Sequence, residues 1–155
     1  MYKICHSAQA VARQQEMEQA LLRLMLQKRY EDISVSDLCQ QLDVPRRAFY
    51  RYFSGKEGAL YALIDHTLAN FFEMPIEVIQ HRGVAREELE RTFGFWKENR
   101  KLLDALSRSN LSGLLLERSS AFALREGFDG EVRDCKVESY FNRAPRRFCS
   151  HQHTP

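Results

Sequence analysis

The chain has 155 residues and a formal net charge of +2, and its 44% hydrophobic and 28% charged residues are typical of a globular protein of one or two small domains. No run of about 18 apolar residues occurs, so the sequence predicts no membrane-spanning helix, and the N-terminus lacks the apolar segment of a signal peptide. The four cysteines are scattered along the chain, which favours a reduced, cytoplasmic setting over a disulfide-bonded one.

Apolar side chains in the first half of the sequence recur every three or four residues, a spacing typical of amphipathic helices. We expect helices over residues 9–28, 35–42 and 45–53, and a longer helix that begins near Lys56. Ser34 or Ser36 is suited to cap the second of these helices, and Asp37 stands three residues after Ser34, as in a capping box.

The second half continues with helical spacing over residues 85–97, 99–107 and 110–126. The last of these segments is apolar around more of its circumference than the others, so we expect it to form a well-buried helix. No stretch of useful length alternates between apolar and polar residues, as a half-buried strand does. The sequence therefore predicts an all-α fold.

The composition of the chain changes after Leu124. Residues 1–124 contain 18 leucines, and residues 125–155 contain none. Residues 127–155 also show no clear helical or strand period, so we expect them to form a poorly ordered tail. Two origins of this tail stay open: an ordinary disordered terminus, or a sequence with which the fold did not evolve, such as a frameshifted end.

The stretch PRRAFYRYFSGK, residues 45–56, holds four cations, four aromatic rings and no acidic residue. On a helical wheel its charged face and its ring-bearing face separate into Arg46, Arg47, Tyr50 and Arg51 on one side and Phe49, Tyr52 and Phe53 on the other. Such a helix can fill a groove with one face while the other face fixes its angle. Two short helices joined by a tight turn, the second rich in cations, are typical of a helix-turn-helix DNA-binding motif.

The motif predicts physical roles for individual residues. The apolar positions expected to hold the two short helices together and against the first helix are Leu38, Leu42, Val44, Phe49 and Phe53. Arg46 and Arg47, at the start of the second short helix, are placed for base edges or nearby phosphates. The hydroxyl of Tyr50 suits a phosphate oxygen. Lys56 opens the following helix, where its ammonium and the free backbone N–H groups suit a phosphate.

The segment YEDISVSDLCQQLDVPRRAFYRYFSGKEGAL resembles the DNA-binding region of the TetR family of bacterial transcriptional regulators, and the resemblance covers about residues 10–72. That region has a small apolar-capped helix, a Gly-Val turn, a helix that ends in Tyr-x-x-Phe, and then Lys-Glu and Leu. The counterparts in this sequence are Leu38, Val44, Tyr50, Phe53, Lys56, Glu57 and Leu60. Asp43 replaces the turn glycine, and Asp tolerates the left-handed conformation better than most residues. Other departures from the pattern are Cys39, Pro45 and Arg29.

Carried over residue by residue, the resemblance implies DNA contacts at Ser36, Arg46, Arg47, Ala48, Tyr50, Arg51, Tyr52 and Lys56. It also implies an all-helical second half that binds a small ligand and pairs with a second copy of the chain. The expected domains are a helix-turn-helix DNA-binding domain over 9–55, a helical region over 56–126 whose first helix connects the two, and the tail over 127–155. Family members are longer, so this second half is short, and it lacks part of the dimer surface if the tail is not helical.

Other candidate sites in the sequence are weaker. Phe71, Phe93 and Trp96 are candidates for a ligand pocket, although such rings more often form core. The cysteines and histidines of the tail match no zinc-binding spacing, so we expect no metal and no cofactor: Cys135, Cys149, His151 and His153. No Ser-His-Asp set, phosphate-binding loop or paired-carboxylate motif occurs, which argues against an enzyme.

The sequence therefore predicts a sequence-specific DNA-binding transcriptional regulator. We expect a repressor whose dimer binds a double-stranded DNA operator and responds to a small ligand in its second half. The alternative is a helical protein-interaction module, or a truncated regulator whose DNA binding is degenerate and non-specific.

Overall fold

The computed structural model describes residues 1–73 and 84–127, and within these ranges the chain forms seven α-helices and one 3₁₀ helix. The helices are α1 (Ala8–Met25), η1 (Tyr30–Asp32), α2 (Val35–Gln41), α3 (Arg46–Tyr50), α4 (Lys56–Glu73), α5 (Val84–Glu98), α6 (Arg100–Arg108) and α7 (Ser112–Gly127). The predicted all-α class is confirmed. Apart from Gly127, the predicted tail lies outside the described residues, and so do the cysteines and histidines considered there as metal ligands.

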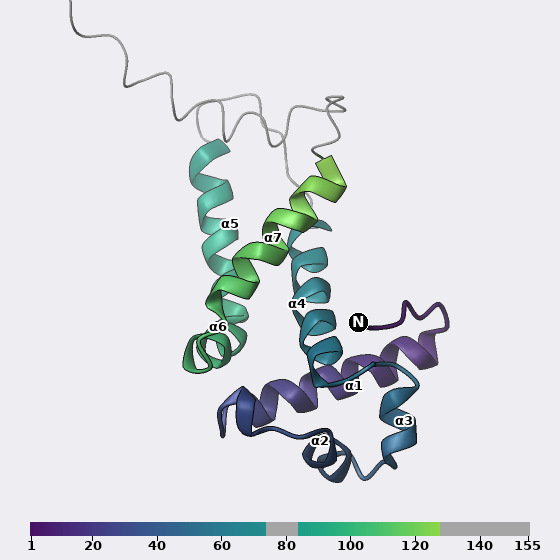
Figure 1. Ribbon diagram of the computed structural model, residues 1–155. Helices are drawn as coiled ribbons and strands as arrows, with labels where there is room; N and C mark the ends of the chain where they lie inside the picture. Colours follow the sequence, from purple (N-terminus) through teal and green to yellow (C-terminus); the bar gives the residue numbers. More distant parts are fainter. Residues whose placement is uncertain (74–83, 128–155) are drawn as a thin grey trace, which may run out of the picture. The chain divides into compact units, whose positions relative to one another are not determined.

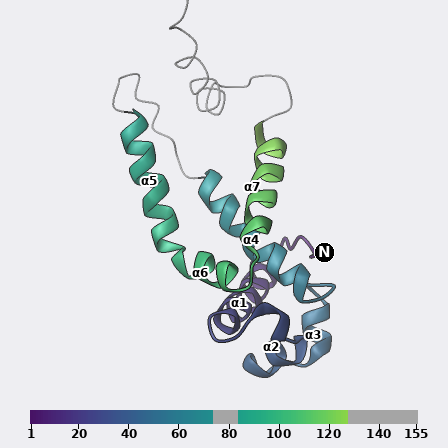
Figure 2. The same ribbon diagram turned by 60° about the vertical axis from the view of Figure 1, so that its left-hand side comes forward.

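The chain divides into two compact units, residues 1–118 and residues 119–155, with the boundary inside α7. The first unit is built around α1, which contacts α2, α4 and α6. Figures 1 and 2 show α2 and α3 on one side of α1, while α4 extends from the other side. The functional division predicted at residues 9–55, 56–126 and 127–155 is a separate matter and stays a prediction.

The N-terminal part of the first unit's core joins α1, α2 and α3 to α4. Its buried apolar side chains are Met17, Ala20, Leu21, Leu24 and Met25 of α1, Ile33, Leu38, Cys39, Phe49 and Phe53 of the segment that follows, and Ala59, Leu60, Ala62, Leu63, Ile64 and Leu68 of α4. Each large side chain of this kind stabilises the fold by about 1.5–3 kcal/mol relative to an exposed position. The short helices α2 and α3 are therefore held by burial, because neither is long enough to be stable alone.

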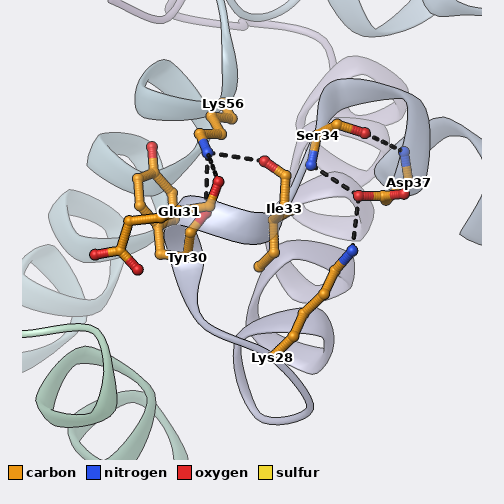
Figure 3. Close-up of polar contacts among 7 residues, drawn as sticks. All are labelled: Lys28, Tyr30, Glu31, Ile33, Ser34, Asp37 and Lys56. Atoms are coloured by element: carbon orange, nitrogen blue, oxygen red, sulfur yellow. Dashed lines mark hydrogen bonds and ion pairs between the residues drawn. The ribbon is translucent and has the colours of Figure 1, made fainter.

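The start of α2 is fixed by a capping box, which resolves the choice between the two candidate caps in favour of Ser34. The Ser34 hydroxyl accepts a hydrogen bond from the Asp37 N–H at 3.1 Å, and the Asp37 carboxylate accepts one from the Ser34 N–H at 2.8 Å. Lys28 Nζ donates to the same carboxylate at 2.8 Å (Figure 3). The hydrogen bonds from Lys28 and from Ser34 lower the pKa of Asp37 to about 2.

Two helices end earlier than their spacing predicts. The first was expected to reach Lys28, but α1 ends at Met25, and Lys28 instead directs its side chain to the carboxylate at the start of α2. The helix expected over residues 45–53 is limited to Arg46–Tyr50, with Pro45 as its N-cap. After α3 the Tyr52 and Phe53 N–H groups donate to the Phe49 carbonyl at 3.0 and 3.1 Å, which closes a turn, and residues 52–54 pair with the beginning of the chain.

The three helices predicted in the second half of the chain are present as α5, α6 and α7, but the expected burial of α7 is wrong. Leu102, Ala105 and Leu106 of α6 are buried, and α6 contacts α1. The helix expected to be well buried is α7, yet no side chain of residues 112–118 is buried and Leu116 is 71% exposed. Apolar side chains around a helix show that burial would stabilise it. They do not show that the rest of the chain offers a surface against which the helix can be buried. None of the helices in the described ranges combines the length and apolar character needed to cross a membrane.

Candidate nucleic-acid interface

The two faces of α3 differ as the helical wheel predicts. Phe49 and Phe53 are 0% and 1% exposed, and their ring centroids lie 5.1 Å apart. Arg46, Arg47 and Tyr50 are exposed on the opposite face, with Tyr50 at 44%. The buried rings therefore fix the angle at which the helix presents its cations, and this division of faces is confirmed.

The turn between α2 and α3 depends on a left-handed residue. Asp43 has φ 51°, the conformation expected where a glycine would be usual. The Val44 N–H then donates to the Cys39 carbonyl at 3.0 Å, which closes the turn behind α2. Leu38 is buried as predicted, whereas Leu42 and Val44 are only half-buried, because both lie at the turn instead of inside a helix.

The exposed face of α3 carries a paired arginine and tyrosine. Arg46 Nη2 donates to the Tyr50 hydroxyl at 3.2 Å, and the Arg46 guanidinium carbon lies 5.8 Å from the centre of the Tyr50 ring. The hydrogen bond to Tyr50 raises the pKa of Arg46, so the guanidinium stays charged. The two residues are one helical turn apart. Together they present a positive charge and a hydroxyl group to a molecule that binds against this face of the helix.

The remaining residues expected to contact DNA lie around this face. Ser36, in the first turn of α2, and Arg51, directly after α3, are exposed, while Ala48 and Tyr52 are half-buried. The structure thus places these residues on α2, on α3 and just beyond it. Their contact with DNA stays a prediction.

Lys56 is directed away from the role expected of its ammonium. Lys56 Nζ donates to the carbonyl oxygens of Tyr30, Glu31 and Ile33 at 2.9, 3.1 and 2.8 Å, as Figure 3 shows. It also lies 4.5 Å from the centre of the Tyr30 ring. An ammonium has three donors, and all three are used here, so the ammonium has none left for a phosphate while these bonds are made. The backbone N–H groups at the start of α4 are not affected by this arrangement.

The second half of the chain is tied to the helix-turn-helix through polar contacts. The Tyr30 N–H donates to Ser109 Oγ at 3.0 Å, and Arg108 Nη1 donates to the Leu26 carbonyl at 2.6 Å, so the turn between α6 and α7 is held against the segment that joins α1 to η1. Arg118 of α7 forms a two-pronged ion pair with Asp65 of α4. These links connect the helices after residue 100 to the elements that position α3.

A buried carboxylate contributes to the contact between α1 and α4. Glu18 is 2% exposed, and its Oε2 lies 3.0 Å from Nδ1 of His66. Burial raises the pKa of Glu18, and the hydrogen bond that the His66 ring donates to the Glu18 carboxylate raises the pKa of His66. The pair joins the long helix α4 to α1, which packs against α2.

The rings expected to line a ligand pocket are only partly brought together. Phe71 and Trp96 lie with their centroids 5.8 Å apart, and Phe95 lies 5.1 Å from Phe71. Phe93 is 71% exposed instead. A helical period that includes Phe93 and Trp96 identifies neighbouring positions on α5 but does not decide which of them turns toward α4.

Several residues that the structure brings to this region were not identified from the sequence. Tyr2, Lys3 and Ser54 form the extended pairing after α3, and Tyr30 supplies both a donor to Ser109 and an acceptor for Lys56. None of these contacts follows a helical or strand period, because each uses the backbone or joins positions far apart in the chain. For Ser54 alone, the sequence contains a possible signal, because this residue lies in the polar stretch between α3 and α4.

Comparison with known proteins gives one match. Residues 19–63 match the model of a family described as "Bacterial regulatory proteins, tetR family". The matched segment runs from within α1 to the first half of α4 and so includes η1, α2 and α3. Searches of curated proteins and of solved structures found no match to this chain.

Proposed function

We propose that this chain, whose residues 19–63 match the family model described as "Bacterial regulatory proteins, tetR family", is a DNA-binding transcriptional regulator that acts as a sequence-specific, ligand-responsive repressor in the form of a homodimer. The observation that carries the proposal is the two-faced helix α3. Phe49 of α3 and Phe53 just beyond it are buried and fix an exposed face of arginines and Tyr50, and such a face suits the major groove.

Two kinds of contact are available on this surface. Arg46 is hydrogen-bonded to Tyr50, and this pair is suited to phosphate oxygens, which fix the position of a protein on DNA but carry no sequence information directly. Arg47 is exposed in the same first turn of α3 and can place its guanidinium on guanine O6 and N7. We assign sequence reading to Arg47 and positioning to the Arg46–Tyr50 pair.

Arg47→Ala is expected to weaken binding to operator DNA about 10- to 100-fold, because a two-pronged contact to guanine contributes about 1–3 kcal/mol of discrimination. The measurement is fluorescence anisotropy with a labelled duplex from the DNA upstream of the protein's own gene and with a scrambled duplex of equal length. The loss should be much larger on the upstream duplex. Arg100→Ala, an equal change of charge in α6, serves as the control and should leave both affinities unchanged.

The same titrations decide between the proposal and its alternative. A specific regulator binds the upstream duplex tightly, and its affinity falls steeply as the salt concentration rises. Equal and weak binding of the wild-type protein to both duplexes would support the interaction module, or a degenerate regulator, in place of a sequence-specific repressor.

Dimer formation follows from the small size of the reading helix. The helix α3 has five residues, which offers few contacts to one half-site, and linking two half-sites multiplies affinity. Leu89 and Phe93 of α5 and Leu116 of α7 are exposed apolar side chains, which supports an association surface in the second half of the chain.

Sedimentation velocity at micromolar protein concentration is expected to show a particle of twice the chain mass of 18.2 kDa. Phe93→Asp, which places a charge on the most exposed ring of α5, should shift this particle toward the single-chain mass. A wild-type protein that stays a single chain at all concentrations and on DNA would refute the dimer.

A response to ligand is supported by the connection between the halves. The helix α4 runs without interruption from Lys56, beside the DNA-binding domain, to the region where Phe71 packs against Phe95 and Trp96. A small molecule that separates these rings would move the far end of α4. Because α4 packs along α1, the movement would change how α3 is presented.

A further inference from the structure

The first residues of the chain are paired with the segment that follows the reading helix. The Lys3 N–H donates to the Tyr52 carbonyl at 3.0 Å, and the Ser54 N–H donates to the Met1 carbonyl at 3.1 Å. Tyr2 and Phe53 face each other as an isolated antiparallel bridge. We call residues 1–3 the N-terminal strap. It is paired with residues 52–54, in the middle of the segment that joins α3 to α4.

The middle residue of the N-terminal strap is anchored on the core side. The Tyr2 hydroxyl donates to Asp65 Oδ2 at 2.6 Å, and the Tyr2 ring meets the His66 ring edge to face at 5.9 Å. Its pairing partner, Phe53, is buried. Since Asp65 also holds Arg118, the strap is fastened at the contact between α4 and α7 as well as to the backbone after α3.

The side chains of the paired segments alternate between two sides, and this alternation determines the side on which the Lys3 side chain lies. Successive side chains of an extended segment point to opposite sides, and side chains of opposed residues point to the same side. Tyr2 and Phe53 point to the core, so Lys3 and its neighbour across the pairing, Tyr52, emerge on the other side. Lys3 is exposed and Tyr52 is half-buried.

We propose that the N-terminal strap is an additional part of the DNA-binding surface, in which Lys3 contacts a phosphate beside Tyr52. This proposal rests on the proposed function. If α3 and Tyr52 contact DNA, then Lys3 lies next to the phosphate backbone of that DNA. The fit is chemical as well as geometric. Lys56, expected to supply a cation here, has its ammonium bonded to three carbonyls, and Lys3 supplies one from the other side of the α3–α4 segment.

Gly58 makes the proposal testable without touching any charge. Gly58 lies in the first turn of α4 and is buried, and a Cβ at this position would lie 2.3 Å from the Met1 carbonyl oxygen. A backbone atom at that distance must move, so Gly58→Ala displaces the N-terminal strap. Alanine is at the same time a better helix former than glycine, so the substitution favours α4 itself.

The test measures the salt dependence of binding to a labelled 30-base-pair duplex for the wild type, Lys3→Gln, Gly58→Ala and the double variant. Each phosphate contact contributes about 0.9 to the slope of log K against log salt concentration. We expect Lys3→Gln to reduce the slope by about 0.9 for each strap bound. Gly58→Ala should give the same reduction and the double variant no more, because both changes remove one contact. Lys101→Gln, the same substitution at an exposed lysine of α6, should leave the slope unchanged.

Amide hydrogen exchange gives a second measurement of the displacement. In Gly58→Ala the Lys3 and Ser54 amides should exchange faster than in the wild type, while those within α4 stay protected. A wild-type slope in Lys3→Gln, or additive losses in the double variant, would overturn the strap and leave the proposed function intact. If the wild type itself shows no salt-dependent binding to DNA, the proposed function fails and the strap fails with it.

Discussion

Phe49→Ala is expected to lower the free energy of unfolding by about 3–5 kcal/mol, the largest effect of any single truncation in the helix-turn-helix. The Phe49 ring is fully buried and packs on Phe53, and α3 has only five helical residues to hold it in place. Removing the ring leaves a cavity at the one point where α3 is attached to the core. The reading face should lose its fixed angle, so affinity for operator DNA falls together with stability.

The measurement is urea unfolding followed by circular dichroism, with the midpoint and slope fitted separately. Ile4→Ala is the control, because it truncates a large apolar side chain that is 78% exposed and lies outside the proposed dimer surface. We expect that control to change the free energy of unfolding by less than about 0.5 kcal/mol. Equal losses in the two variants would show that α3 is not held by its buried ring.

Lys56→Met is expected to lower the free energy of unfolding by about 2–3 kcal/mol, because hydrogen bonds to a charged group are worth more than neutral ones and three are lost together. The carbonyls of Tyr30, Glu31 and Ile33 would lose the ammonium that gathers them. Methionine keeps an unbranched stem as far as Cε and lacks the ammonium, so the loss reports on the ammonium and its hydrogen bonds. With the ammonium gone, η1 should no longer be fastened to the start of α4.

A phosphate contact by the Lys56 ammonium predicts the opposite pattern. In that case stability would be unchanged in Lys56→Met, and the slope of log K against log salt concentration would decrease by about 0.9. Lys101→Met provides the matched control for the loss of an exposed lysine. Lys56→Arg separates charge from shape, because a planar guanidinium cannot direct its donors at three converging carbonyls as an ammonium does.

The elements that sequence could predict are those whose cause is local. The cationic and aromatic faces of α3 follow from helical period alone, and the left-handed turn at Asp43 follows from the residue types that tolerate it. The cap at Ser34 needed only the acid three residues later. In each case the residues that decide the structure lie within one or two turns of one another.

The elements that sequence did not predict depend on distant partners. Lys56 reaches carbonyls 23 to 26 positions earlier in the chain, and nothing around Lys56 distinguishes that destination from a phosphate. The N-terminal strap is three residues long, too short to show a period. The exposure of α7 depends on which surfaces the rest of the chain offers it, and amphipathic spacing contains no information about these.

The residue at the meeting point of these links is Tyr30, and it is joined through its main chain. Its N–H donates to Ser109 and its carbonyl accepts from Lys56, so the main chain of one residue connects the turn after α6 with the first residue of α4. Many side chains could stand at position 30 without breaking either bond, whereas the two positions that reach it tolerate little change. A survey of substitutions would therefore detect the two hydrogen bonds at Ser109 and Lys56, whereas at position 30 it would detect only the loss of the ring that lies against the Lys56 ammonium.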